Sequence, residues 1–378
     1  MSGKSCSLLL AALLAPAVLP GQSGQFVVRL GRDTLAIEQY KRTADRLYGE
    51  QVIRSPRTVH RIYTVRFGPG GAAQRFELVT HNVSGAPGPA ETKATVTFEG
   101  DSAMATVPSG DSTLVVRARV GQGALPYLGQ SFGLVEEVAR RARAAGGDQY
   151  TTAMLALGDT EPMPVTVTRR GADSLTMMLD GIGPLRARVD ERGTLLGVTG
   201  IGGTAQITVE RVHGLDVDAL GKSFASRSLG TLSPSDSIRT SVAGAVLSVR
   251  YSRPSTRGRS IFGNVVPWNQ VWRTGANQAT VFETSADLVV GGTTVPAGKY
   301  TLWTIPAPDA WKLIINRNTG QWGTAYDAKY DFARLNMTVQ ALPQPVEQFT
   351  IAIDPQGSGG VLKLEWDRTR ASIPFSRN

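Results

Sequence analysis

The chain has 378 residues, of which 41% are hydrophobic and 19% are charged. At about 100–200 residues per domain, this length predicts two domains with a sizeable core. The 42 glycines and 21 prolines predict the frequent turns of a β-rich fold. The net charge of +9 is spread thinly, with no run of Lys or Arg longer than two residues. The sequence therefore predicts no nucleic-acid partner, because such binding uses a dense basic surface.

The N-terminus has the pattern of a secretory signal. Lys4 supplies the positive charge, and residues 7–19 form an apolar run that is too short to span a bilayer comfortably. Gly21 and Ser23 suit the small positions before a cleavage site, so residues 1–23 are predicted to be removed. We therefore expect a periplasmic or secreted bacterial protein that does not span the membrane after cleavage. The alternative is an uncleaved anchor.

The single cysteine, Cys6, lies before the apolar run. A lipid-anchored protein needs its cysteine just after such a run, so lipid anchoring is not predicted. Cleavage would leave a chain without cysteine, which excludes disulfides, thiolate metal sites and cysteine nucleophiles. The mature fold would then depend on its core for stability.

Residues 24–221 are predicted to form a first, β-rich domain. Short alternating segments between Gly/Asp turns indicate an antiparallel sheet. These segments are residues 94–100, 112–120, 164–171, 186–193 and 206–212. We expect an antiparallel sheet that can be curved.

One helix is predicted near 131–145, with Ser131 and Gly146 as its caps. Its apolar side should pack on one face of the sheet, with Glu136–Arg140 and Glu137–Arg141 pairs on the solvent side. A curved sheet covered by this helix could enclose an apolar cavity, as in bacterial lipoprotein carriers. That analogy is one of shape alone.

Residues 222–240 are small and polar and contain Pro234, which is typical of a linker. All six tryptophans follow this segment and all three histidines precede it, so two different cores are expected. Residues 241–378 are predicted to form a β-sandwich. The predicted strands are 245–252, 287–295 with a turn at Gly291-Gly292, 298–305, 311–317, 348–354 and 361–367, with long connections at 253–278 and 317–345.

Most catalytic signatures are absent from the sequence. It contains no nucleophile elbow, Gly-rich phosphate loop or HExxH motif. His60, His81 and His213 lack the spacing of metal ligands, and the second domain has no histidine to act as a general base. We therefore predict no catalytic residue, no metal and no cofactor. A hydrolase with paired carboxylates is the alternative, with Glu283 and Asp327 as one conceivable pair.

Two connecting segments, 253–263 and 266–280, form the strongest candidate surface. Guanidinium groups suit carboxylate, sulfate or phosphate, and tryptophan rings suit sugars or other flat apolar faces. The candidate ligand-binding residues are Arg253, Arg259, Trp268, Trp272, Arg273, Asn277 and Trp322, with Arg257 beside them. The alternative is a folding role, because tryptophan often fills a core and a neighbouring arginine can tie down a loop. Trp303, Trp311 and Trp366 lie inside predicted strands and are assigned to the core.

The same segments resemble a bacterial family known as domain of unknown function (DUF) family 2911. The resemblance covers about residues 240–370. It rests on Arg253-Pro254-Ser255, Gly258-Arg259, Ile261-Phe262-Gly263, Val266-Pro267, residues 271–277, residues 296–300 and Trp322-Gly323. It implies an exported bacterial β-rich domain and no particular reaction. The N-terminal domain is left unassigned.

The leading prediction is an exported envelope protein that binds or supports without catalysing. Its partner would be a small anionic or glycan-like ligand, or a protein of the envelope. One alternative is a hydrolase of envelope glycans or esters that uses paired carboxylates. The other is a lipid carrier, with the first sheet and its helix as the container.

Overall fold

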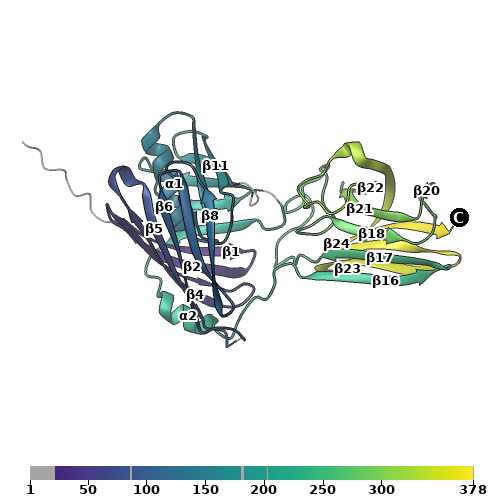
Figure 1. Ribbon diagram of the computed structural model, residues 1–378. Helices are drawn as coiled ribbons and strands as arrows, with labels where there is room; N and C mark the ends of the chain where they lie inside the picture. Colours follow the sequence, from purple (N-terminus) through teal and green to yellow (C-terminus); the bar gives the residue numbers. More distant parts are fainter. Residues whose placement is uncertain (1–21, 86, 180–182, 202, 378) are drawn as a thin grey trace, which may run out of the picture.

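The computed structural model describes residues 22–85, 87–179, 183–201 and 203–377. These residues form two β-sheets, which lie side by side along the molecule (Figure 1). The mainly β fold predicted from the sequence is confirmed. The predicted signal lies outside the described residues except for Gln22 and Ser23, which begin the first strand. The cleavage point predicted after Ser23 therefore falls inside that strand.

The first sheet has the strand order β8-β7-β6-β5-β4-β3-β2-β1-β15-β14-β13-β12-β11-β10-β9. Neighbouring strands are antiparallel, except that β9 and β10 are parallel. The strands are β1 (Gln22–Leu30), β2 (Asp33–Arg42), β3 (Arg46–Ile53), β4 (Val59–Phe67), β5 (Ala73–Asn82), β6 (Glu91–Glu99), β7 (Ser102–Ser109), β8 (Ser112–Arg119), β9 (Leu125–Tyr127), β10 (Gln149–Ala156), β11 (Met163–Arg169), β12 (Ser174–Leu179), β13 (Gly183–Val189), β14 (Leu195–Gly200) and β15 (Ile207–Val212). The sequence patterns located five of these strands and missed the rest.

The two edges of this sheet are consecutive in the chain. Residues 120–124 alone connect β8 to β9, and five residues span at most about 18 Å. The sheet must therefore curl until its edges approach each other, and β9 lies against β5. Figure 1 shows the resulting curved sheet.

Helices cover opposite faces of the first sheet. Phe26 and Val28 of β1 point into the main core with α1 (Phe132–Ala145). Val27, between them, packs instead with α2 (Val217–Phe224) on the outer face. This alternation follows from the two-residue period of a strand. The curl of the sheet therefore encloses α1 and leaves α2 outside.

The predicted helix and both of its caps are confirmed. Ser131 Oγ accepts a hydrogen bond from the Leu134 N–H at 3.4 Å, and Gly146 ends the helix with φ 72°. The prediction that its glutamates face solvent is wrong. Glu136 and Glu137 are 1% and 4% exposed, because the sheet surrounds the helix.

Arginines and a tyrosine of the sheet pair with these buried glutamates. Glu136 contacts Tyr40 and Arg211, while Glu137 accepts a hydrogen bond from Arg42 at 3.0 Å. The predicted Glu137–Arg141 pair is present at 3.2 Å. The predicted Glu136–Arg140 pair is replaced, because Arg140 contacts Glu137 at 3.3 Å. The polar side of α1 is thus joined to the sheet rather than to water.

The second sheet has the order β16-β17-β18-β21-β22-β23-β24-β19-β20. Its strands are β16 (Ser235–Val242), β17 (Ala245–Ser252), β18 (Thr280–Thr284), β19 (Leu288–Val290), β20 (Thr293–Val295), β21 (Gly298–Ile305), β22 (Trp311–Asn316), β23 (Asp331–Gln356) and β24 (Gly359–Arg377). The long β23 pairs with β22 through residues 331–337 and with β24 through residues 338–356. It therefore carries the chain from a first layer, formed by β16, β17, β18, β21 and β22, to a second layer, formed by β24, β19 and β20. Leu247 and Trp311 of the first layer share a core with Leu288 and Trp366 of the second layer, as in a sandwich.

The two predicted connections differ in outcome. Residues 253–278 contain isolated bridges but no strand, as expected. The connection expected at 317–345 is wrong from Asp331 onward, because β23 begins there. The side chains of Leu335 and Met337 point into the core, as the two-residue period of a strand requires. This alternating stretch is shorter than the segments from which the other strands were predicted.

The predicted linker, residues 222–240, overlaps α2 at one end and β16 at the other. The intervening segment is tied to the first sheet. Arg54 Nη2 donates to the Arg227 carbonyl at 2.6 Å, and the Leu229 N–H donates to the Arg54 carbonyl at 2.8 Å.

Candidate functional site

Trp272 begins the loop at residues 272–277, called here the signature loop, and its ring lies in the core. The side chain is 7% exposed and stacks on Trp366, with ring centroids 5.8 Å apart and an interplanar angle of 18°. Phe349 and Trp311 meet it edge-on. Its indole N–H donates to the Gly275 carbonyl at 3.2 Å. Trp272 therefore supports the fold, and the loop is fixed to it.

Buried threonines set the shape of the signature loop. Thr274 is 0% exposed and has φ 52°, which is costly for a β-branched residue. Its hydroxyl lies 3.2 Å from that of Thr304, and the Thr280 hydroxyl donates to its carbonyl at 2.7 Å. A Cβ on Gly275 would lie 3.0 Å from the Ser252 carbonyl, which favours glycine there. The turn directs Asn277 to the surface.

Three of the predicted site residues come together at the end of this loop. Arg273 Nη1 and the Gly323 N–H both donate to the Asn277 carbonyl, at 3.3 and 2.9 Å. Trp322, next to Gly323, is 49% exposed. Burial lowers the pKa of Arg273, and no acidic side chain among the described residues pairs with it. The loop thus places a partly buried cation and an exposed indole near one another.

The other predicted residues lie elsewhere. Arg253 contacts Asp236 at 3.3 Å and the Phe349 carbonyl at 3.1 Å. Trp268 is half-buried and stacks on Phe262. The guanidinium of Arg259 donates to the carbonyls of Ser255, Thr256 and Thr204 at 2.8, 3.0 and 2.7 Å. The seven candidates therefore do not share one pocket.

Residues 253–259, the arginine segment, join the two sheets. Arg257 is 8% exposed and forms an ion pair with Asp33, while its carbonyl accepts from the Arg32 N–H at 2.9 Å. Glu347 of β23 accepts from the Arg257 N–H at 3.0 Å and lies 3.9 Å from Arg32. Guanidinium groups that suit anionic ligands here bind the chain's own carboxylates and carbonyls.

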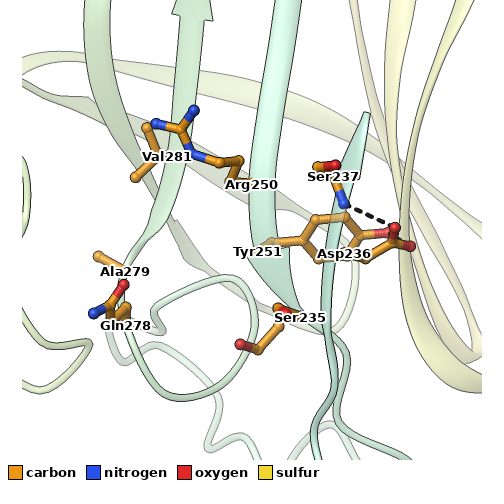
Figure 2. Close-up of a pocket in the computed structure, with 9 residues that line it drawn as sticks. Ser235, Asp236, Ser237, Arg250, Tyr251, Gln278, Ala279 and Val281 are labelled. Carbon is orange, nitrogen blue, oxygen red and sulfur yellow. Dashed lines mark hydrogen bonds between the residues drawn. The ribbon is translucent and has the colours of Figure 1, made fainter. Parts of the chain in front are cut away.

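An open groove of about 470 Å³ lies beside the signature loop, at β16 and β17 and the start of β18. Figure 2 shows the side chains around it. It is lined by Ser235, Asp236, Ser237, Arg250, Tyr251, Ser252, Gln278, Ala279 and Val281. Hydroxyl, amide, guanidinium and carboxylate groups therefore face one concave surface.

The charges of the groove are partly neutralised. Asp236 accepts from the Ser237 N–H at 2.8 Å and lies 3.5 Å from the Tyr251 hydroxyl. Arg250 lies 3.5 Å from Glu283, with 54% of its side chain exposed. Burial raises the pKa of Tyr251, so this hydroxyl stays protonated and can donate. The groove offers both donors and acceptors to a ligand.

The signature loop lies next to this groove, which is lined by Gln278 and Ala279 directly after the loop. Asn277 Nδ2 lies 3.4 Å from the Ser252 hydroxyl, and Gln278 pairs with Trp322 across an isolated bridge. Asp236 and Gln278 were not predicted as site residues. The available signal was the segment 235–241, which is polar except for Ile238, as is typical of an edge strand next to a solvated surface.

The two carboxylates predicted for a hydrolase each lie beside cationic side chains. Glu283 contacts Arg250 and Lys299, each at 3.5 Å. Burial raises its pKa, but the positive charges of these neighbours outweigh that effect and lower the pKa overall. A hydrogen bond from Lys329 lowers the pKa of Asp327. Neither group is suited to hold a proton as a general acid at neutral pH.

The buried carboxylate of Glu38, in β2, accepts four hydrogen bonds. The hydroxyls of Ser131 and Tyr63 donate at 2.6 and 2.7 Å, and the N–H groups of Phe132 and Gly133 donate at 2.6 and 3.0 Å. Burial raises the pKa of Glu38 to about 7, against the lowering effect of these bonds. The residue is 0% exposed. It is therefore an acceptor for the unpaired N–H groups at the start of α1, out of reach of a substrate.

The structure also brings His60 and His81 together, which their spacing in the sequence concealed. They are partners across β4 and β5, with ring centroids 6.0 Å apart. Even so, no group of three or more His, Cys, Asp or Glu side chains in the described part of the chain is placed to hold a metal ion. Within the described ranges, no helix has the length and hydrophobicity needed to cross a membrane.

Comparison with family models confirms the resemblance predicted for the C-terminal part. Residues 233–375 match the family described as "Protein of unknown function (DUF2911)". This range contains the arginine segment, the signature loop and all of the second sheet except the last two residues of β24. No curated protein matches the chain.

Two solved structures are similar to part of the chain. A DUF1089 family protein from Pseudomonas aeruginosa has 15% identity and a TM-score of 0.33, over 44% of this chain and 90% of that one. A β-barrel-like protein of domain of unknown function DUF1849 from Brucella abortus has 12% identity and a TM-score of 0.36, over 51% and 94%. These values carry no argument about function.

Proposed function

We propose that the protein is an exported bacterial envelope protein that binds a polar, glycan-like ligand without transforming it. The groove beside the signature loop is the binding site. The observation that carries this proposal is the lining of the groove, where Asp236, Arg250 and Gln278 provide donors and acceptors on one concave surface. Sugar hydroxyls both donate and accept hydrogen bonds, so they match such a mixed lining.

Trp322 supports the choice of a glycan. A tryptophan that is 49% exposed is unusual for a residue of this size, and it lies beside Gln278 at the groove. An indole face can pack against the apolar face of a sugar ring. Arg273 and Asn277 hold the segment that carries Trp322, through the Asn277 carbonyl.

Binding without catalysis is favoured over hydrolysis by the count of carboxylates. Among the described residues that line the groove, Asp236 is the one acidic residue. Glycoside hydrolysis ordinarily requires two carboxyl groups that flank the scissile bond. The lipid-carrier alternative is less favoured, because side chains of α1 such as Leu134 and Ala139, both 0% exposed, fill the concave side of the first sheet.

Tryptophan fluorescence tests the proposed site. Trp322 is exposed while Trp303, Trp311 and Trp366 are buried, so a ligand at the groove should change the emission of one indole. We expect saturable changes on titration with glycan fragments of the bacterial envelope. Gln278→Ala should remove the response. Gln344→Ala, at an exposed glutamine on β23, is the matched control and should keep it.

Two results would contradict the binding proposal. One is the absence of a response to any glycan fragment, and the other is an equal loss in both glutamine variants. Export is tested separately by determining the N-terminus of the protein recovered from the periplasm or medium. A mature chain that begins near Gly24 supports the proposal, and an intact Met1 overturns it.

A further inference from the structure

A second groove, of about 450 Å³, crosses the first sheet at β13, β14 and β15. Its lining includes Arg186, Arg188, Gly197, Thr199, Thr208 and Glu210. We propose that this groove binds an acidic polysaccharide, through Arg186 and Arg188. The proposal is independent of the ligand of the second sheet.

The groove lies on the outer face of the sheet. Ala187, Val198 and Val209 are at most 3% exposed and point into the core that contains α1. Their neighbours along each strand therefore point outward. The register aligns them in two rows across the three strands, which are Arg186, Thr199, Thr208 and Arg188, Gly197, Glu210. Because Gly197 has no side chain, the surface is depressed between Arg188 and Glu210.

Arg186 and Arg188 carry charge that the described residues do not neutralise. Both are exposed, and neither forms an ion pair or a side-chain hydrogen bond with another described residue. Residues two apart on a strand are about 7 Å apart, so both guanidinium groups can contact one chain of anions. Glu210 lies 3.8 Å from Arg29, so its negative charge is partly neutralised by that residue. Arg186 and Arg188 therefore leave the groove with a net positive charge.

The chemistry of the lining favours a carbohydrate over other anions. No aromatic ring is present among the described residues of the lining, so these residues offer no platform for stacking nucleic-acid bases. Two free arginines are fewer than the about four to eight basic residues typical of sites for anionic lipids. The hydroxyls of Thr199 and Thr208 and the carboxylate of Glu210 can bind sugar hydroxyls, while the arginines bind carboxylate or sulfate groups.

The test measures binding of the purified protein to polygalacturonate, with uncharged dextran as the comparison. We expect binding to polygalacturonate that weakens as salt rises and no binding to dextran. The double variant Arg186→Gln/Arg188→Gln should lose about tenfold or more in affinity, since two charge-assisted contacts are removed. Because these side chains are exposed, its melting temperature should stay close to that of the parent.

Arg46→Gln/Arg66→Gln is the matched control. These two exposed arginines are cross-strand partners on β3 and β4 of the same sheet, away from the groove, and their loss changes the net charge equally. We expect less than about a twofold effect from this control, because only the screened long-range charge changes. Gln278→Ala should bind polygalacturonate as the parent does, which separates this groove from that of the second sheet.

Three outcomes would overturn the proposal. The first is an equal loss of affinity in the two arginine double variants, which would show that the effect comes from the overall charge of the protein. The second is equal binding of dextran. The third is tighter binding of single-stranded DNA than of polygalacturonate under the same salt, which would reassign the surface to nucleic acid.

Discussion

The two sheets fill their interiors in different ways. The curved first sheet encloses a helix, and buried carboxylates such as Glu38 and Glu136 join that helix to the strands. The second sheet encloses no helix in the part of the chain that the structure describes, and rings such as Trp272, Trp311 and Trp366 fill the space between its layers. A helix brings unpaired N–H groups into the interior and so requires buried acceptors. Two facing layers about 10 Å apart have their backbone groups paired already, so apolar rings suffice.

The largest expected effect tests whether the aromatic rings stabilise the second sheet. Trp272→Ala should lower the free energy of unfolding by about 3–5 kcal/mol, since it leaves a cavity among Phe349, Trp311 and Trp366. Denaturant unfolding of the variant and the parent measures this difference. Trp322→Ala removes the same side chain from the surface and should cost less than about 1 kcal/mol. Equal costs for the two variants would mean that the cluster is not what stabilises the second sheet.

The next effect tests the buried carboxylates of the first sheet, through Glu38. The pKa of its carboxyl is about 7 in the folded protein and 4.5 in the unfolded chain. The folded state therefore holds the extra proton between these values, and stability falls as pH rises from 4.5 to about 7. The fall amounts to ~3 kcal/mol, from ~2.5 pKa units at about 1.4 kcal/mol each. Denaturant unfolding at several pH values measures it.

Glu38→Gln separates the proton from the hydrogen bonds. The amide oxygen can still accept from the Phe132 and Gly133 N–H groups, and the Ser131 and Tyr63 hydroxyls can rotate to accept from the amide. The variant should lose the share of the pH dependence due to Glu38 and equal or exceed the parent in stability at pH 7. Glu38→Ala should instead be destabilised at every pH. A parent protein whose stability is flat between pH 4.5 and 7 would refute this account.

A smaller effect tests whether the two sheets act as one unit. Arg257→Ala removes the ion pair with Asp33, which should cost about 1–2 kcal/mol and move the thermal transitions of the two sheets apart in calorimetry. A double-mutant cycle with Asp33→Ala isolates the pair. Additive costs in that cycle would show that the arginine segment does not couple the sheets through this contact.

The smallest effect concerns the turn of the signature loop. Asn277 has φ 60°, a conformation that asparagine and glycine tolerate and alanine does not. Asn277→Ala should therefore cost about 1 kcal/mol, and Asn277→Gly should remain within about 0.5 kcal/mol of the parent. Thermal unfolding of both variants measures these differences in stability. A glycine variant as unstable as the alanine variant would assign the cost to the lost contacts of the Asn277 amide with Ser252.

The sequence predicted the features that depend on neighbouring residues. The caps of α1, the turn at Gly291-Gly292 and the strand 298–305 follow from local patterns and were correct. The burial of Glu136 and Glu137 could not be predicted in this way. Their four-residue spacing to arginines is typical of a solvated helix face, and the partners that bury them come from β2 and β15.

The candidate site was predicted in part for the same reason. The signature loop was located, and the resemblance of its region to a known family was correct. The groove beside it depends on Asp236 and Gln278, which come from segments about 40 positions apart and meet through strand pairing. Arg257 was grouped with the ligand-binding arginines because a charge pattern does not reveal whether its partner is a ligand or Asp33.

The pairing of β1 with β15 has a consequence for the order in which the chain folds. Gln25 lies opposite Val212, which is 187 positions later in the chain. Both β1 and β14 keep an unpaired edge until residues 207–212 have emerged from the ribosome. Contacts of such long range form slowly. The strands of the second sheet pair over shorter separations, as in the continuous β23–β24 hairpin, so that region can fold as soon as it is complete. The first sheet is therefore the part of the protein that most needs protection from aggregation during synthesis.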